Sequence, residues 1–165
     1  MLKELLSKEE GKTLAISNSL ESFQRQIEMT VKIKGISHIT LICQDLNKSA
    51  KLFKELFDAI EVYSSERKNF SISQEKFLLI GDLWIALMEG SPIERSYNHI
   101  AFYVEEENLL FFESKIHSLE LKILPSRPRN LQEGKSIYFY DYDNHLFELH
   151  TGDLATRLTY YNQTQ

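Results

Sequence analysis

The chain of 165 residues is 42% hydrophobic and 26% charged, and its formal net charge is −5 at pH 7. These values indicate an ordinary globular domain and exclude a disordered or fibrous chain. The acidic balance argues against a nucleic-acid groove as the main site, while a small anion held by a few local cations stays compatible with it. No apolar run reaches the length of a membrane span or a signal peptide, so we expect no membrane partner and a cytoplasmic location.

Residues 1–30 form a polar leader to which the sequence assigns no function, and residues 31–165 are predicted to form the domain. The single cysteine, Cys43, excludes an intrachain disulfide. It lies in an apolar run, where a packed thiol is the expected state and a nucleophile is the rarer one.

The first half of the domain is predicted to begin with a strand over residues 36–43. Asp45 then offers a helix N-cap, and Leu46, Ala50, Phe53 and Phe57 recur on one helical face. Strand-like runs follow at residues 60–64, 70–72, 77–80 and 83–88.

The second half repeats this order. A strand is predicted over residues 98–104 and a helix over residues 109–119, and strands follow at residues 121–124, 137–140 and 146–150. His38 corresponds to His99, and Gly90 corresponds to Gly152 at nearly the same separation, which indicates an internal repeat. The predicted fold class is α+β, with two βαβββ modules (about 34–90 and 96–152) that form a cupped mixed sheet, followed by a C-terminal tail.

A hairpin is predicted at the end of the second module, where two apolar runs flank the turn formers of residues 141–144. Ser136 and Tyr138 share one face of its first strand, and Glu148 and His150 share one face of its second strand. An acid inside an apolar strand is costly to bury unless it is paired or bound to a cation. Glu148 therefore needs a partner.

A metal ion is the partner that the repeat favours. His38 and His99 occupy equivalent positions early in the two modules, while Glu148 corresponds to about Ala86 in the first module. Two imidazoles and one carboxylate bind a divalent first-row metal and leave coordination positions open for a substrate. His150 is a rival ligand. Taken singly, a strand histidine is more often a hydrogen-bonded core residue, and a strand glutamate usually faces water.

Five segments of the chain resemble a known family. They are SHITLI, FSISQEKFLLIGDLWIALMEG, YNHIAF, RPRNLQEGKSIYFYDYDNHLFELH and TGDLATRL, which together cover about residues 35–161. Their order and spacing are similar to those of the vicinal oxygen chelate superfamily, which includes glyoxalase I, extradiol dioxygenases and fosfomycin-resistance proteins. Among these, the chain most resembles the fosfomycin-hydrolysing epoxide hydrolases of the FosX type.

The resemblance implies a role for each matching position. His38, His99 and Glu148 would bind the metal, which in this family is usually Mn²⁺, and Glu75 would act as the general base on water. The substrate-binding positions that it implies are Thr40 near the oxirane oxygen, Trp84 and Tyr97 as pocket walls, and Arg129, Ser136, Tyr138 and Arg157 at or near the phosphonate. Arg127 competes with Arg129 for its place. Without the family, Glu75 and Lys76 would be interpreted as a solvated surface pair. The arginines would be interpreted as surface charges, and the aromatic residues as packing residues.

The implied activity is hydration of the epoxide of fosfomycin, a small phosphonate. The implied assembly is a homodimer with exchanged strands, in which His38 of one chain serves a site that His99 and Glu148 of the other complete. A metal-dependent thiol transferase that adds glutathione, cysteine or a similar thiol is the first alternative, and Glu75 favours hydrolysis over it because a thiol needs no base for water. A non-catalytic drug-binding protein and an Fe²⁺ dioxygenase are the others. The His/His/Glu set argues against the former and the arginines against the latter.

Overall fold

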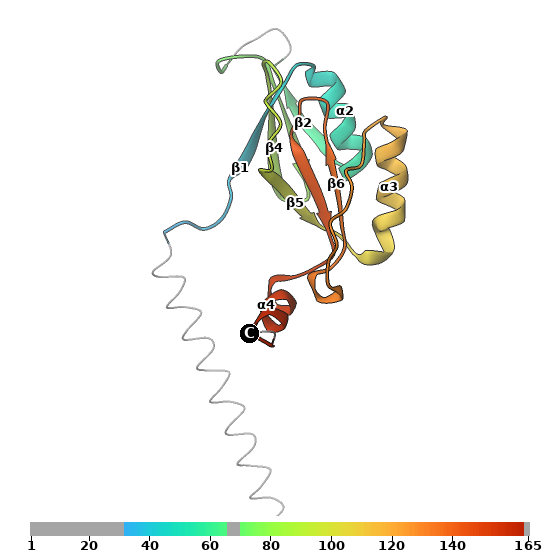
Figure 1. The fold of residues 1–165 in the computed structure, drawn as a ribbon. Coiled ribbons are helices and arrows are strands. Elements are labelled where there is room, and N and C mark those ends of the chain that lie inside the picture. Colours follow the sequence, from blue (N-terminus) through green and yellow to red (C-terminus); the bar gives the residue numbers. More distant parts are fainter. Residues whose placement is uncertain (1–31, 66–69, 164–165) are drawn as a thin grey trace, which may run out of the picture. The chain divides into compact units, whose positions relative to one another are not determined.

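The computed structural model describes residues 32–65 and 70–163, and Figure 1 shows their fold. The leader predicted for residues 1–30 lies outside the described residues, so its prediction stays untested. The description below concerns the unit formed by Ser37–Gln165. Its elements are β1 His38–Cys43, α2 Leu46–Phe57, β2 Ile60–Ser64, β3 Glu75–Ile80, β4 Leu83–Glu89, β5 His99–Tyr103, the 3-10 helix η1 Glu106–Asn108, α3 Leu109–Ser118, the 3-10 helix η2 Leu131–Glu133, β6 Ser136–Tyr140, β7 Leu146–His150 and α4 Leu154–Gln163.

The strands form two sheets of the same topology. The four-stranded sheet has the order β1-β4-β3-β2, and the three-stranded sheet has the order β5-β7-β6. In each sheet the first strand pairs in parallel with the last one, and the remaining pairs are antiparallel. Thr40 lies opposite Ala86, and Ala101 lies opposite Glu148. The predicted equivalence of Glu148 and Ala86 is therefore confirmed.

Two of the predicted strands are wrong. Residues 70–73 form bends, with Phe70 77% and Ile72 92% exposed, because no neighbouring strand covers their side chains. Residues 121–124 contribute one isolated bridge, from Ile123 to Phe139. Pro125 follows directly, and a proline lacks the N–H that a longer ladder would require.

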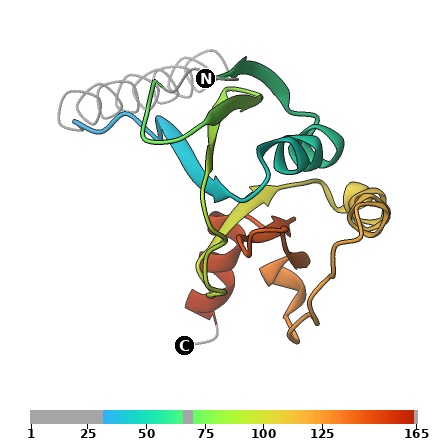
Figure 2. The same ribbon diagram turned by 90° about the horizontal axis from the view of Figure 1, so that it is seen from above.

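Helix α2 begins where the sequence predicts. The Asp45 carboxylate accepts hydrogen bonds from the backbone N–H groups of Asn47 and Lys48, so it caps two of the unpaired donors of the first turn. The helix ends at Asp58, whose φ of 52° lies in the left-handed region. Helices α2 and α3 contact each other and lie side by side in both views of the ribbon (Figures 1 and 2). No helix in the described ranges is both long and apolar enough to span a membrane.

The core lies between the helices and the covered faces of the two sheets. Phe53 of α2, Phe139 of β6 and Phe147 of β7 are its largest fully buried side chains, and Phe53 meets Phe147 edge to face with ring centroids 5.8 Å apart. Cys43 is fully buried in the same cluster. Burial raises the pKa of its thiol to about 12. The prediction of a packed thiol is therefore confirmed, since a thiol in this state supplies almost no thiolate.

Asp143, in the β6–β7 turn, connects the second module to the first. Its Oδ1 accepts a hydrogen bond of 2.8 Å from the Gln44 backbone N–H, and its Oδ2 accepts one of 3.1 Å from the Ser49 hydroxyl. Asn144 closes the turn with a φ of 71°, the left-handed conformation that asparagine tolerates. The turn thus holds β7, and with it Glu148, against the start of α2.

Candidate metal and substrate site

The candidate site is built on the three-stranded sheet, where Glu148 is central. Tyr138 lies directly opposite Glu148, and Ser136 lies opposite His150, so all four side chains emerge from one face. Glu148 is only 5% exposed. An acid so buried requires compensating donors.

Several donors meet one oxygen of Glu148. Ser136 Oγ lies 2.5 Å and Arg129 Nη2 lies 3.2 Å from Oε1. Arg129 Nη2 also donates to the Tyr138 hydroxyl over 2.9 Å. Burial alone would raise the pKa of Glu148, but the hydrogen bonds of Ser136 and Tyr138 and the charges of His150 and Arg129 outweigh it and hold that pKa below its ordinary value. The carboxylate is therefore ionised at neutral pH.

The second oxygen of Glu148 faces His99. Oε2 lies 3.0 Å from His99 Nε2, while Nδ1 lies 2.8 Å from the Tyr97 carbonyl oxygen. A carbonyl only accepts, so Nδ1 carries the proton, and in the neutral ring Nε2 presents a lone pair to the carboxylate. Two facing lone-pair atoms repel each other, and either a proton on Nε2 or a cation beside both atoms relieves that repulsion.

A divalent metal fits this pair. Two neighbouring ligand atoms, each about 2.1 Å from one first-row ion, stand about 3 Å apart. The bond from His99 Nδ1 to a backbone carbonyl is the outer contact that orients a metal-binding imidazole. Nitrogen and carboxylate donors suit Mn²⁺ and its neighbours in the first row.

The four-stranded sheet carries His38, whose ring lies against the Trp84 ring with centroids 4.4 Å apart. Trp84 meets Phe77 at 5.0 Å, and Phe77 meets Tyr63 at 4.8 Å. This row of four rings crosses all four strands on the face that also carries Thr40. In the described part of the chain, Tyr63 Oη and Trp84 Nε1 are the buried side-chain polar atoms without a hydrogen-bond partner.

Tyr63 is a member of this face that sequence reasoning missed. The register of β2 shifts between Glu61 and Tyr63, so simple alternation along the strand assigns the wrong faces. The signal that could have identified Tyr63 is its pairing with Phe77, and this pairing is visible only in the structure.

Glu75 begins β3 and lies opposite Met88, on the same face as Phe77. It is only 8% exposed. Ser65 fixes this end of the strand, since its hydroxyl accepts from the Glu75 backbone N–H over 2.9 Å. Lys76 instead pairs with Glu61 over 2.8 Å. The reading of Glu75 and Lys76 as a solvated surface pair is therefore wrong.

Arg157, on α4, lies against His150. Its Nη2 is 3.0 Å from His150 Nε2 and 3.3 Å from the Glu133 carbonyl oxygen. Arg127 pairs with the Glu133 carboxylate over 3.0 Å, whereas Arg129 turns toward Glu148. Of the two competing arginines, Arg129 is thus the one that the structure brings to the site.

The His150 ring is enclosed by protein groups. Its Nδ1 lies 2.8 Å from Ser136 Oγ and 3.2 Å from the Lys135 carbonyl oxygen, and its Nε2 meets Arg157. Burial lowers the pKa of His150 below its ordinary value despite the opposing attraction of Glu148. As a rival metal ligand, His150 has both ring nitrogens already in use.

The sequence-predicted residues fall into two groups. The three-stranded sheet and its loops carry His99, Glu148, Tyr97, Arg129, Ser136 and Tyr138. The four-stranded sheet carries His38, Thr40, Trp84 and Glu75. Within the described residues of one chain, no three His, Cys, Asp or Glu side chains come together as a metal site.

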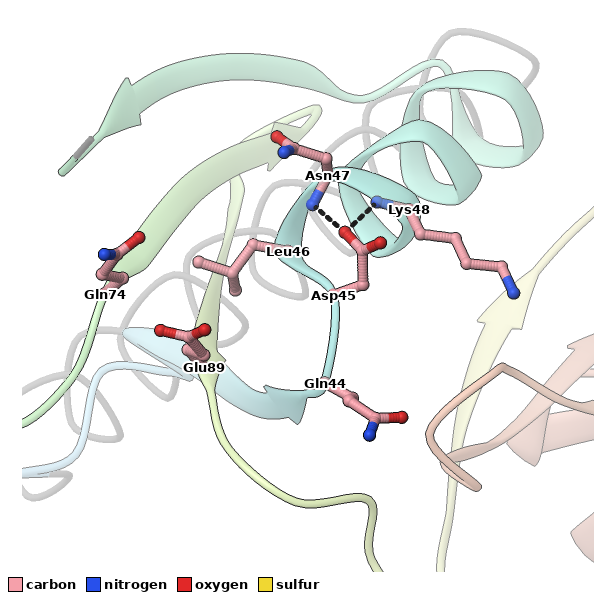
Figure 3. Close-up of a pocket in the computed structure, with 7 residues that line it drawn as sticks. All are labelled: Gln44, Asp45, Leu46, Asn47, Lys48, Gln74 and Glu89. Carbon is pink, nitrogen blue, oxygen red and sulfur yellow. Dashed lines mark hydrogen bonds between the residues drawn. The ribbon is translucent and has the colours of Figure 1, made fainter. Parts of the chain in front are cut away.

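A hollow of about 590 Å³ lies at the start of α2 (Figure 3). Asp45, Lys48 and Glu89 are among its lining residues, and the Asp45 carboxylate is occupied with capping the helix. None of the predicted site residues lines it. A hollow of about 410 Å³ nearby is lined by Glu75, Ser65 and Lys76, among others.

The loop before β6 and the segment after β7 cross closely behind the site. A Cβ atom added at Gly152 would lie 2.8 Å from both the Glu133 carbonyl oxygen and His150 Nε2. One added at Gly134 would lie 2.5 Å from the Gly152 nitrogen. Neither position has room for a side chain.

The sequence and the fold both have known relatives. The model of the Glyoxalase/Bleomycin resistance protein/Dioxygenase superfamily matches residues 35–149. The chain is 54% identical over 132 residues to the fosfomycin resistance protein FosX of Listeria innocua, covering 79% of this chain and 99% of that protein. It is 39% identical over 135 residues to the metallothiol transferase FosB of Bacillus licheniformis, covering 79% and 83%.

A solved structure of similar fold is a variant of FosX from Listeria monocytogenes, in complex with Mn(II) and 1S,2S-dihydroxypropylphosphonic acid. The TM-score is 0.72 and the sequence identity 51%, over 78% of this chain and 98% of that one.

Proposed function

Because the chain belongs to the Glyoxalase/Bleomycin resistance protein/Dioxygenase superfamily, we propose that it is a manganese-dependent enzyme that confers fosfomycin resistance by adding water to the epoxide. The observation that carries the proposal is the pair of His99 Nε2 and Glu148 Oε2, 3.0 Å apart, with the imidazole proton on the opposite nitrogen. The vicinal diol bound to the Listeria FosX variant is the kind of product that water addition to a propyl epoxide gives.

His99 and Glu148 would hold the metal together with His38. When bound, the ion supplies a Lewis acid for the negative charge that develops on the oxirane oxygen. Two bonds use Arg129 Nη2, and a guanidinium has five N–H donors, so we assign its remaining donors to the phosphonate, with Tyr138 beside them.

Glu75 takes a proton from the attacking water in this proposal. Water is a poor nucleophile, so a carboxylate near the carbon under attack must accept its proton as the bond forms. Glu75 is buried on the sheet face that carries the ring row of Tyr63, Phe77, Trp84 and His38. With Thr40 and Tyr97, this row would form the walls around the oxirane.

We assign the working form to a homodimer. His38 lies on one sheet and His99 and Glu148 on the other, so strand exchange between two chains supplies a complete ligand set. A two-fold symmetric dimer of this kind contains two equivalent sites.

Phosphorus NMR of the purified protein with fosfomycin and Mn²⁺, in the absence of any thiol, tests the activity. We expect the epoxide signal to be replaced by that of the diol. Omitting Mn²⁺ is the control, and it should leave the epoxide signal unchanged.

A thiol transferase is the second candidate, supported by the 39% identity to FosB. Conversion that starts only when cysteine or glutathione is added would assign the chain to that class. The buried carboxylate of Glu75 favours hydration, because a thiol transferase has no water to deprotonate.

The variant Glu75→Gln separates catalysis from metal binding. We expect the hydration rate to fall on the order of 10²–10⁴-fold, the usual worth of general-base help, while the Kd for Mn²⁺ stays the same. Glu89→Gln, an exposed carboxylate at the end of β4, is the matched control. An unchanged rate in Glu75→Gln would remove this residue from the mechanism.

A further inference from the structure

The hydrogen bonds behind Glu148 form a continuous chain from α4 to the carboxylate. Arg157 Nη2 lies 3.0 Å from His150 Nε2, His150 Nδ1 lies 2.8 Å from Ser136 Oγ, and Ser136 Oγ lies 2.5 Å from Glu148 Oε1. Ser136 and Arg157 are two of the four residues that the sequence resemblance places at or near the phosphonate. In the structure, their polar atoms contact His150 and Glu148.

The direction of every bond in this chain follows from its first member. A guanidinium only donates, so His150 Nε2 must accept and its proton must lie on Nδ1. The Lys135 carbonyl oxygen, 3.2 Å from Nδ1, requires the same tautomer because it only accepts. Ser136 Oγ therefore receives the Nδ1 proton, and its own hydroxyl proton is directed to Glu148 Oε1.

We propose that His150 is a positioning residue that acts through Ser136 to select which oxygen of Glu148 is presented to the metal. Oε1 is held by Ser136 and by Arg129, while Oε2 faces His99 Nε2. The inference rests on the proposed function in one respect, that Glu148 is a metal ligand. In the substrate-free chain, Ser136 then supports the ligand.

A double-mutant cycle on Mn²⁺ affinity tests the proposal without any turnover. Loss of an outer contact to a metal ligand costs on the order of 10–100-fold in affinity, and we expect such a loss for Ser136→Ala and for His150→Leu. Because His150 acts through Ser136, the double variant should bind Mn²⁺ no more weakly than Ser136→Ala alone. Losses that multiply, or no loss in His150→Leu, would overturn the proposal.

Two further variants separate positioning from a general effect on folding. His150→Asn keeps an N–H near the place of Nδ1 and should restore most of the Mn²⁺ affinity that His150→Leu loses. His117→Leu, on the exposed surface of α3, is the matched control and should bind Mn²⁺ like the parent chain. Equal losses in His150→Asn and His150→Leu would contradict a role for the N–H donor.

The tautomer can be measured in the metal-free protein by ¹⁵N NMR of the histidine ring. We expect His150 to be protonated at Nδ1 and unprotonated at Nε2. Protonation at Nε2 in the parent chain would refute the chain of bonds. This readout stands even if no fosfomycin is hydrated, so it distinguishes failure of the positioning role from failure of the proposed activity.

Discussion

At the scale of single residues, Glu133 illustrates how the loop before β6 is held. Its carboxylate accepts a hydrogen bond from Arg127 and one from the Asn130 backbone N–H, each 3.0 Å long. These two bonds lower the pKa of Glu133 from 4.5 to about 2, and the bond from Arg127 contributes more than the bond from Asn130. The same residue's carbonyl oxygen accepts from Arg157, so the loop and the site share one anchor.

The lowered pKa predicts a pH dependence of stability. A carboxylate with a depressed pKa stabilises the fold above its unfolded pKa, and that contribution is lost as the pH falls through the folded value. The melting temperature of Glu133→Gln should therefore lie below that of the parent chain at pH 7, and the difference should shrink between about pH 5 and pH 2. Glu113→Gln, on the exposed face of α3, is the control. A difference independent of pH would contradict this assignment.

Single residues also mark what the sequence can predict about the site. The repeat selects His38 and His99, because they occupy equivalent positions in the two modules, and the cost of burying an acid in an apolar strand selects Glu148. Contacts such as that between Arg157 and His150 depend on how a loop and a terminal helix return to the sheet. No periodicity encodes that return, so the sequence alone does not predict this contact.

At the scale of elements, the β6–β7 turn is joined to α2 by Asp143, which is 2% exposed. Replacing it by alanine leaves the Ser49 hydroxyl and the Gln44 backbone N–H without their acceptor. Each buried unsatisfied group costs about 1–3 kcal/mol, so Asp143→Ala should lower the free energy of unfolding by about 2–5 kcal/mol. Urea denaturation at a fixed protein concentration measures it.

Asp82→Ala, in the exposed turn between β3 and β4, is the matched control and should change stability by less than about 0.5 kcal/mol. Equal stability of Asp143→Ala and the parent chain would mean that the turn does not connect the modules.

Elements with a strong local pattern are confirmed, and those without one are not. Helix α2 combines an apolar stripe with the Asp45 cap, and the β6–β7 hairpin combines two apolar runs with Asn144 in the left-handed conformation. The predicted strand at residues 70–72 has alternating apolar residues but no partner strand. Strand formation depends on that partner, which a local pattern does not report.

At the scale of the whole molecule, the division of ligands between two sheets predicts complementation between chains. The variants His38→Ala and His99→Ala should each lose Mn²⁺ binding and activity. In a mixed dimer with exchanged ligands, one site receives both defects and the other receives none. Random mixing should therefore restore about one quarter of the parental activity per chain, because about half of the dimers are mixed.

The measurement is the fosfomycin hydration rate after the two variants are refolded together, with each variant refolded alone as the control. A mixture as inactive as its components would place all three ligands in one chain.

The crossing of Gly134 and Gly152 has a consequence for drug susceptibility. The two glycines lie in connecting segments and carry no reactive group. A methyl group at Gly152 would nevertheless press on the His150 imidazole, which is linked through Ser136 to the proposed ligand Glu148. The small substitution Gly152→Ala should thus displace His150 and, through Ser136, disturb the metal ligand Glu148. We therefore expect Gly152→Ala to weaken the resistance that the chain confers, although every polar group stays in place.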